Sequence, residues 1–210
     1  MAAVEAALTG PSDPDYSSPW TDLDVSAASV EADDSVITVD LTADDADSLA
    51  SAPAGLDAVD ARLAVQALVR TAQGATEAGR TPVLFLVNSD PATRLLGIKL
   101  NGPVKAGNDL KDLANVWINT PLEGDTVSVG STVEGVAITF EATVRWQVLQ
   151  GTTVVEEGFT TAAEGMKRSP YSFEFPDVPP GDYTLVVTED DPSGGEGPGP
   201  DADSRNITVQ

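Results

Sequence analysis

The chain has 210 residues, and its 34 acidic against 11 basic side chains give a formal net charge of −23. Such a surface repels nucleic acids and anionic membranes, because phosphate contacts from Lys and Arg supply most of the non-specific affinity for both. The absence of Cys and His excludes thiolate and imidazole metal sites, Ser-His-Asp triads, Cys nucleophiles and histidine acid–base catalysis within this chain.

The acidic residues are unevenly distributed along the chain. Residues 1–61 hold fourteen Asp and Glu and no Lys or Arg, and the first basic residue is Arg62. These acids are interpreted as a solvated coat that aids solubility. The hydrophobic content of 41% suffices for two ordinary domains, and the low aromatic content of 5% means cores of Val, Leu, Ile and Ala. No apolar run has the length of a membrane span.

The first half of the chain predicts a small α/β layer domain over residues 1–110. Residues 2–8 are expected to form a short helix that ends at Gly10-Pro11, and Trp20 is expected to pack over a core edge. Residues 24–31 and 35–41 predict a hairpin, because Ile37, Val39 and Leu41 share one face of the second strand.

A crossover helix follows the hairpin. Asp57 is a suitable N-cap for a helix that runs to Ala72, with an apolar stripe on one side and Arg62, Gln66 and Arg70 facing away from it. Residues 82–87 are apolar on both faces, which predicts a central strand covered on both sides. Strand, helix and strand together indicate a crossover connection. Residues 98–100 predict one more short strand.

Residues 105–115 are polar and predict a linker between two domains. Nearby, Arg94, Lys99, Lys105 and Lys111 gather four basic side chains into a short stretch. This group is either a docking face for an acidic partner or, as we prefer, a solvated hinge.

Residues 115–210 predict an immunoglobulin-like β-sandwich, because the hydrophobic period changes to two and about seven strands alternate with Gly and Pro turns. The predicted strands cover residues 116–119, 126–129, 135–148 (two strands bent near Phe140), 152–158, 171–175, 182–189 and 206–209. The clearest is residues 140–148, in which Phe140, Ala142, Val144, Trp146 and Val148 alternate with polar residues.

Aromatic residues of the sandwich have distinct expected roles. Tyr183, which follows Pro179-Pro180-Gly181-Asp182 at a strand entrance, resembles a tyrosine corner. Trp146 is expected to be buried as a plug between the sheets, together with Tyr183. Trp117 and Tyr171, with Trp146, are the rings that would form a ligand platform if they were exposed.

The acidic loop of residues 189–203 is the most distinctive stretch. Asp190, Asp191, Glu196, Asp201 and Asp203 are weak candidates for calcium ligands. The preferred interpretation is a plain connection between the last two strands, ordered without metal because its prolines limit the unfolded ensemble. Another acidic group, Asp44, Asp45 and Asp47, lacks the spacing of a calcium loop. No cofactor is expected.

Paired carboxylates are the only remaining catalytic equipment. Glu156-Glu157 and residues 189–191 are candidates for glycoside hydrolysis, which uses two carboxyl groups. Neighbouring residues on a strand point to opposite faces and seldom converge on one bond, so catalysis is disfavoured.

Several segments resemble a known pair of bacterial domains. Residues 140–146, residues 180–185 and above all Glu189-Asp-Asp-Pro-Ser-Gly-Gly-Glu-Gly197 resemble the immunoglobulin-like domain of spore germination proteins associated with GerM. The segment before Pro11, the strand from Ile37 to Leu41 and the run from Val83 to Val87 are similar to the GerMN domain, here without its first strand. The arrangement also resembles lipoproteins of actinobacterial envelopes.

The resemblance implies an extracytoplasmic envelope protein whose domains bind or assemble and do not catalyse, anchored to the membrane through an N-terminal segment upstream of Met1. It supplies no catalytic residues. We therefore expect a non-enzymatic protein that mediates assembly or adhesion with other envelope proteins or wall polymers, in a family linked to sporulation and germination. The alternative is an accessory module that binds cell-wall carbohydrate.

Overall fold

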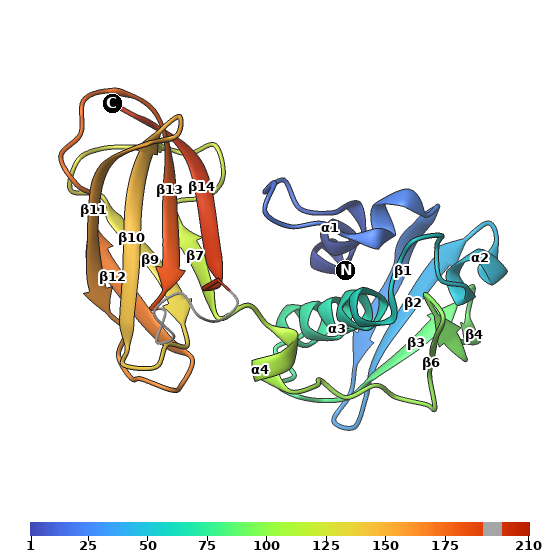
Figure 1. Cartoon of the computed structure of the whole chain (residues 1–210). Coiled ribbons are helices and arrows are strands. Elements are labelled where there is room, and N and C mark those ends of the chain that lie inside the picture. Colours follow the sequence, from blue (N-terminus) through green and yellow to red (C-terminus); the bar gives the residue numbers. More distant parts are fainter. Residues whose placement is uncertain (191–198) are drawn as a thin grey trace. The chain divides into compact units, whose positions relative to one another are not determined.

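The computed structural model describes residues 1–190 and 199–210, and Figure 1 shows its course. The chain divides into two compact units, Met1–Asp112 and Leu113–Gln210. The first is a small α/β unit and the second is a β-sandwich, which confirms the predicted fold class. None of the helices in the described residues is long and apolar enough to cross a membrane.

The α/β unit is built on a four-stranded sheet of order β1-β2-β3-β4. Strand β1 (Val25–Ala32) pairs antiparallel with β2 (Ile37–Ala43), which confirms the predicted hairpin. Strand β3 (Val83–Val87) pairs parallel with β2, as the predicted crossover requires. The short β4 (Asp90–Pro91) is the last strand of this sheet, next to β3. Strands β5 (Arg94–Leu95) and β6 (Ile98–Lys99) form a separate hairpin.

Helices α1 (Ala2–Thr9) and α3 (Ala58–Ala75) pack against each other beside the sheet (Figure 1). The predicted N-cap is confirmed, because the Asp57 carboxylate accepts hydrogen bonds from the Val59 and Asp60 amides at 2.8 and 2.9 Å. Trp20, in the 3₁₀ turn Pro19–Asp22, is buried and its indole Nε1 donates to the Ala64 carbonyl at 3.2 Å. The unit also contains the short helices α2 (Ala46–Ala50) and α4 (Asp109–Asp112).

Strand β3 lies between β2 and β4, but only one of its faces is fully covered. Val83 and Phe85 are buried in the core shared with α3, whereas Leu84 and Leu86 on the opposite face are half-buried. The prediction of cover on both sides was therefore wrong for the second face. A run of five apolar residues predicts a buried strand, but it does not show whether other elements pack on one face or on both.

Three arginines hold the last segment of the α/β unit in place, and we call this group the arginine clamp: Arg62, Arg70 and Arg80 with Asp109 and Asp112. Arg70 contacts Asp109 at 2.9 Å, and Arg80 contacts the same carboxylate at 3.2 Å. Arg62 pairs with Asp112, whose side chain is 1% exposed.

The linker between the units is shorter than the predicted residues 105–115, because the arginine clamp and Gln66 bind its first part to the α/β unit. Gln66 is buried, accepts from the Gly107 amide at 2.8 Å and donates to the Lys105 carbonyl at 3.2 Å. Residues 105–112 therefore belong to the α/β unit, and three residues remain before the first strand of the sandwich at Val116. Gln66 and Arg70 do face away from the sheet, as predicted, but this segment covers them.

The clamp should loosen in acid. Burial raises the pKa of Asp109, but hydrogen bonds and charge from Arg70 and Arg80 outweigh this and hold the pKa below its ordinary 3.8. A carboxyl group with a depressed pKa stabilises the fold above its ordinary pKa, and that stabilisation is lost as pH falls through the lower folded value. We expect the amide signals of residues 105–112 to move toward unfolded positions below about pH 4, followed by NMR.

An Asp109→Asn variant should show the loosened segment already at neutral pH. The matched control is Asp33→Asn, because hydrogen bonds from Ser35 and Val36 also lower the pKa of Asp33, outside the clamp. Acid-induced shifts of residues 105–112 that persist unchanged in Asp109→Asn would contradict the assignment.

The sandwich consists of a five-stranded sheet, order β11-β10-β13-β14-β8, and a three-stranded sheet, order β12-β9-β7. The larger sheet contains β8 (Thr126–Val127), β10 (Thr143–Gln150), β11 (Thr153–Thr161), β13 (Gly181–Glu189) and β14 (Ala202–Val209). The smaller contains β7 (Val116–Thr120), β9 (Thr132–Ala137) and β12 (Ser169–Glu174). Each predicted strand is present, with boundaries shifted by a few residues.

The tyrosine corner is confirmed, and the expectation for Trp146 needs a correction. Tyr183 is buried and its hydroxyl donates to the Pro179 carbonyl at 2.8 Å. Trp146 points between the sheets but is only half-buried, stacked on Phe173 with ring centroids 5.1 Å apart. Gly158, directly opposite Trp146 on β11, leaves room for the indole.

The beginning of the central strand also differs from the prediction. Phe140 lies in the turn before β10 and is 58% exposed, although the alternating pattern placed it on the apolar face. Ala142 has a φ of 61°, a left-handed conformation that interrupts the strand. The alternation of side chains therefore predicts burial correctly from Ala142 onward and fails at Phe140.

The fit of Trp146 against Gly158 can be tested by two substitutions. A Cβ atom at Gly158 would lie 2.5 Å from Cζ2 of Trp146, so Gly158→Ala must displace the ring and change its fluorescence and near-UV circular dichroism. Trp146→Ala should cost about 2 to 3 kcal/mol in urea unfolding, below the range of a fully buried tryptophan because the ring is half-buried. Gly74→Ala is the control, since nothing lies within 4 Å of its added Cβ. Unchanged Trp146 spectra in Gly158→Ala would refute this packing.

Candidate functional site

The candidate functional site is the free edge of the larger sheet of the sandwich. Within the described residues, strand β11 pairs with β10 on one side and with no strand on the other. An unpaired edge presents a row of backbone N–H and C=O groups that can bind another strand. Near the end of β11, the Thr160 hydroxyl donates to the Ser172 carbonyl of β12 at 2.8 Å.

Apolar side chains along β11 are exposed to solvent. Val154 and Val155 are 41% and 38% exposed, and Phe159 is 72% exposed. Phe159 lies opposite Arg145 of β10, on the outer face of the sheet. An aromatic ring held on a strand and facing water is the residue type that dominates the energy of protein interfaces.

The middle of the same edge is protected against pairing with copies of itself. Glu156 and Glu157 are exposed side by side, and a bulge interrupts the ladder opposite Val148 and Leu149. Charged residues and bulges are the common devices that prevent edge-to-edge aggregation. Negative charges placed directly opposite these glutamates would destabilise a paired strand.

The two rings proposed as a ligand platform do not form one. Tyr171 is 3% exposed and its hydroxyl donates to the Trp117 carbonyl at 3.2 Å, so it offers no free ring face. Trp117 is half-buried, and the Arg168 guanidinium lies over its ring at 4.5 Å. Periodicity could not distinguish these rings from exposed ones, because the cover comes from distant segments.

The proposed calcium ligands have separate structural partners. Asp190 pairs with Arg145 at 2.9 Å, and Asp201 accepts a hydrogen bond from the Asn115 amide at 3.2 Å. Asp191 and Glu196 lie outside the described residues, as does most of the loop expected to be ordered without metal. Among the described residues, no group of three or more acidic side chains could hold a metal ion.

Asp203 forms a buried ion pair that joins the two sheets. Its carboxylate contacts the Arg205 guanidinium at 2.8 Å and accepts a hydrogen bond from the Ile118 amide at 2.6 Å. Arg205 in turn donates to the Ile118 carbonyl at 2.7 Å. Two side chains of β14 thus satisfy both backbone groups of one residue in β7, and Asp203 is unavailable to a ligand.

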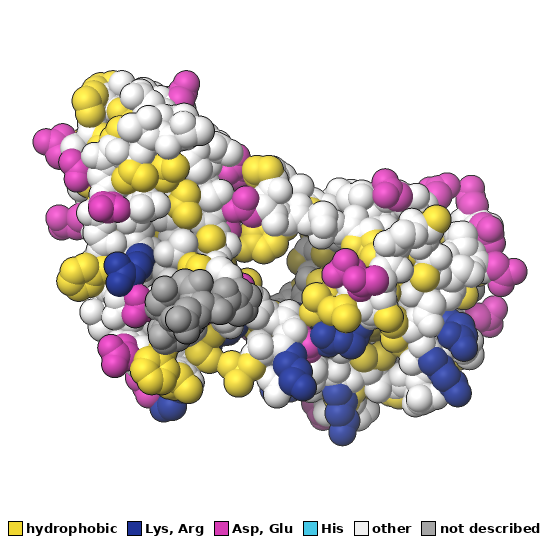
Figure 2. Space-filling view, viewed as in Figure 1, with side chains coloured by type: hydrophobic (Ala, Val, Ile, Leu, Met, Phe, Trp, Pro, Cys, Tyr) yellow, Lys and Arg dark blue, Asp and Glu magenta, His cyan; other side chains and the backbone are white. Residues whose placement is uncertain are grey.

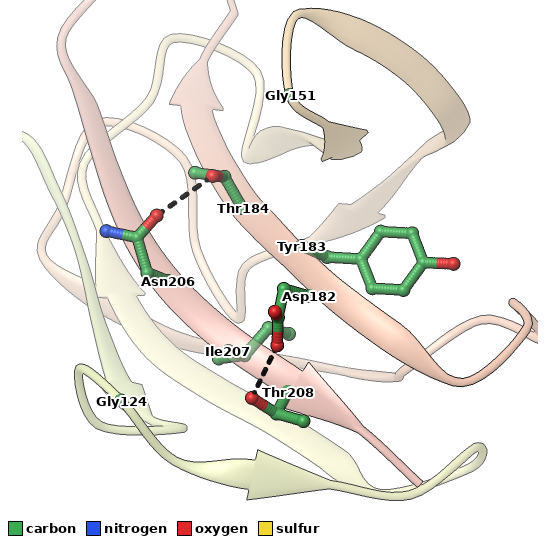
Figure 3. A pocket seen from close by; sticks show the side chains of 8 residues that line it. All are labelled: Gly124, Gly151, Asp182, Tyr183, Thr184, Asn206, Ile207 and Thr208. Carbon is green, nitrogen blue, oxygen red and sulfur yellow. Dashed lines mark hydrogen bonds between the residues drawn. The ribbon is translucent and has the colours of Figure 1, made fainter.

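A shallow hollow of about 300 Å³ lies over the ends of β13 and β14 (Figure 3). Its polar side chains bind each other: Thr208 donates to Asp182 at 2.9 Å, and Thr184 donates to Asn206 at 3.0 Å. Figure 3 shows both pairs bridging the two strands. Asp182 is the one carboxylate among its described lining residues, whereas glycoside hydrolysis by paired carboxyl groups uses two.

These features define a two-domain protein with an α/β unit, an immunoglobulin-like sandwich and an open sheet edge. Residues 1–93 match the family described as sporulation and spore germination, and residues 115–196 match the immunoglobulin-like domain of bacterial spore germination. The chain therefore carries a germination-associated domain followed by a germination-associated immunoglobulin-like domain, which confirms the resemblance found in the sequence.

Solved structures show only distant likeness. An engineered protein is 14% identical with a TM-score of 0.34, and the match covers 70% of this chain but 36% of that chain. CopC from Methylosinus trichosporium OB3b is 17% identical with a TM-score of 0.33, covering 45% of this chain and 93% of that chain. A comparison with curated proteins gives no match.

The buried ion pair gives a test of the sandwich. Arg205→Leu should destabilise the sandwich by about 3 to 5 kcal/mol, because it leaves the Asp203 carboxylate buried without its partner. The matched control is Arg145→Leu, which removes an exposed pair with Asp190 and should cost less than about 1 kcal/mol. Urea unfolding measures both, and equal costs would contradict the role of the buried pair.

Proposed function

We propose that this protein is a non-enzymatic assembly protein of the bacterial cell surface, whose sandwich binds an extended segment of another envelope protein along β11. The observation that carries the proposal is the open edge of β11 with Phe159 exposed on it. Strand addition to a sheet edge combines backbone hydrogen bonds for affinity with side-chain contacts for specificity. The germination-associated domains support a role in sporulation or germination.

The partner strand has a defined chemistry. Lys or Arg opposite Glu156 and Glu157 would compensate their charges, and an apolar residue beside Phe159 would cover its ring. Basic residues in the partner would also increase the rate of association with a chain of net charge −23.

Site-specific photo-cross-linking in cells tests this assignment. A photoreactive phenylalanine analogue at Phe159 should give one defined protein adduct, identified by mass spectrometry. Phe140 is the matched control, because it is also an exposed phenylalanine of the sandwich but lies in a turn. Adducts at position 140 and none at 159 would overturn the assignment of the edge.

The alternative, a module that binds cell-wall carbohydrate, has its own readout. The purified chain is sedimented with isolated cell walls, and release of soluble wall fragments is measured in parallel. The proposal expects no binding that depends on an aromatic residue of the sandwich and no release of fragments. Sedimentation lost in Trp117→Ala but retained in Phe159→Glu would favour the carbohydrate alternative, and fragment release would show an enzyme.

A further inference from the structure

The α/β unit has a second candidate surface, a pocket of about 200 Å³ between α3 and the segment that follows β5. We call it the basic-rimmed pocket. It is lined by Arg62, Val65 and Gln66 of α3 and by residues 98–104. Val65 and Leu100 are buried in its floor, whereas Lys99 and the turn at Asn101 and Gly102 are exposed at its rim.

The charge around this pocket is opposite to that of the rest of the chain. Residues 91–108 contain three basic residues and no acidic one, in a protein of net charge −23. Figure 2 shows Lys and Arg side chains gathered on the lower part of the unit drawn on the right, with Asp and Glu along its other rim. The basic side chains are therefore concentrated on one side of the unit.

Two of these cations are placed unfavourably for the isolated chain. Arg94 and Lys99 are direct partners in the β5–β6 hairpin, where like charges opposite each other destabilise the pair. Neither forms an ion pair with the described residues, and Arg94 donates only to the Gly97 carbonyl, at 2.9 Å. An anion bound between them would relieve the repulsion.

The two acids that follow this segment in the chain are already engaged. Asp109 is held by Arg70 and Arg80, and Asp112 by Arg62. Arg62 uses one terminal nitrogen for Asp112, and its side chain is 41% exposed beside the pocket. Lys99 and Lys105 are exposed and form no ion pair with the described residues, so an external anion could bind them without displacing a carboxylate.

We infer that the basic-rimmed pocket binds an acidic peptide segment of a partner protein, with one apolar side chain on Val65 and Leu100 and carboxylates at Lys99, Lys105 and Arg62. The apolar floor favours a peptide over a wall phosphate polymer, which has charge but no apolar group to bury. This inference rests on the proposed assembly function and adds a second contact of opposite charge preference, since β11 selects basic partners.

Titration of the whole isotope-labelled chain with a synthetic peptide tests the inference by NMR. The probe is an acetylated pentapeptide with a central leucine flanked by two glutamates on each side. We expect amide shifts in residues 98–105 and in α3 around Arg62. The double variant Lys99→Glu with Lys105→Glu should weaken binding about tenfold or more, equal to about 1.4 kcal/mol. Added salt should also weaken it.

Control variants and control peptides separate the contribution of charge from that of the apolar side chain. Lys167→Glu makes one such lysine-to-glutamate change at an exposed lysine of the sandwich and should leave the affinity unchanged. A peptide with glutamines in place of the glutamates, and one with serine in place of leucine, should each bind more weakly. Equal binding of the serine peptide, or tighter binding of purified teichoic acid, would overturn the peptide assignment, as would shifts confined to other residues.

The test is independent of the proposed function. Failure of the peptide to bind would leave cross-linking at Phe159 unaffected, and absence of those cross-links would leave the titration unaffected. The thermal melt of the double variant must match that of the parent chain, which is expected because Lys99 and Lys105 are exposed.

Discussion

The buried ion pair between Asp203 and Arg205 is the constraint on which the sandwich depends. These residues occupy two inward positions of β14, followed on the same face by Ile207 and Val209. Burying a charge pair is costly unless hydrogen bonds satisfy its remaining polar atoms. Here the Ile118 amide and carbonyl do so, and the pair consequently fixes the position of β7 against β14. The strand order of the larger sheet then places β11 at its edge.

Carboxylates elsewhere in the chain also serve the fold. Asp57 caps α3, Asp112 is bound by Arg62, and the buried Asp40 accepts from the Ser89 amide and hydroxyl at 3.0 and 2.9 Å. Glu189 accepts from the Asn115 side chain and from the Asp201 amide. Each of these carboxylates is therefore engaged by backbone or side-chain donors of its own unit.

Local patterns predicted those features that depend on neighbours in sequence. Alternation located the strands, and Asp57 was recognisable as a cap because its carboxylate meets amides of the next turn. Tyr183 was recognisable because its hydroxyl returns to Pro179, four residues earlier. Phe140 was misplaced because alternation continues through a turn that the left-handed conformation of Ala142 creates, and Ala gives no sign of such a conformation.

Contacts between distant segments could not be read in this way. Gln66 looked solvent-facing on its helix, but it is buried by residues 105–107, about forty positions later. Asp203 looked like one more acid of the loop between the last two strands, since its partner Ile118 lies 85 residues away. The position of β11 at the edge of the sheet follows from the order of the strands and not from the composition of β11. The exposed Phe159 is the one feature of this strand that could have indicated an unprotected edge.

The opposite charge preferences of the two candidate surfaces have a consequence for assembly. Three residues connect the units, and two of them are already bound to the sandwich: the Ala114 carbonyl by Arg168 at 2.8 Å, and the Asn115 side chain by Glu189. Such a short connection keeps the second binding site at high effective concentration once the first is occupied. A basic strand suited to β11 would be repelled by the basic-rimmed pocket, and an acidic segment suited to the pocket would be repelled by Glu156 and Glu157. Each surface would therefore select its own partner. Weak contacts at both sites would then give a stable assembly only when both partner segments are present.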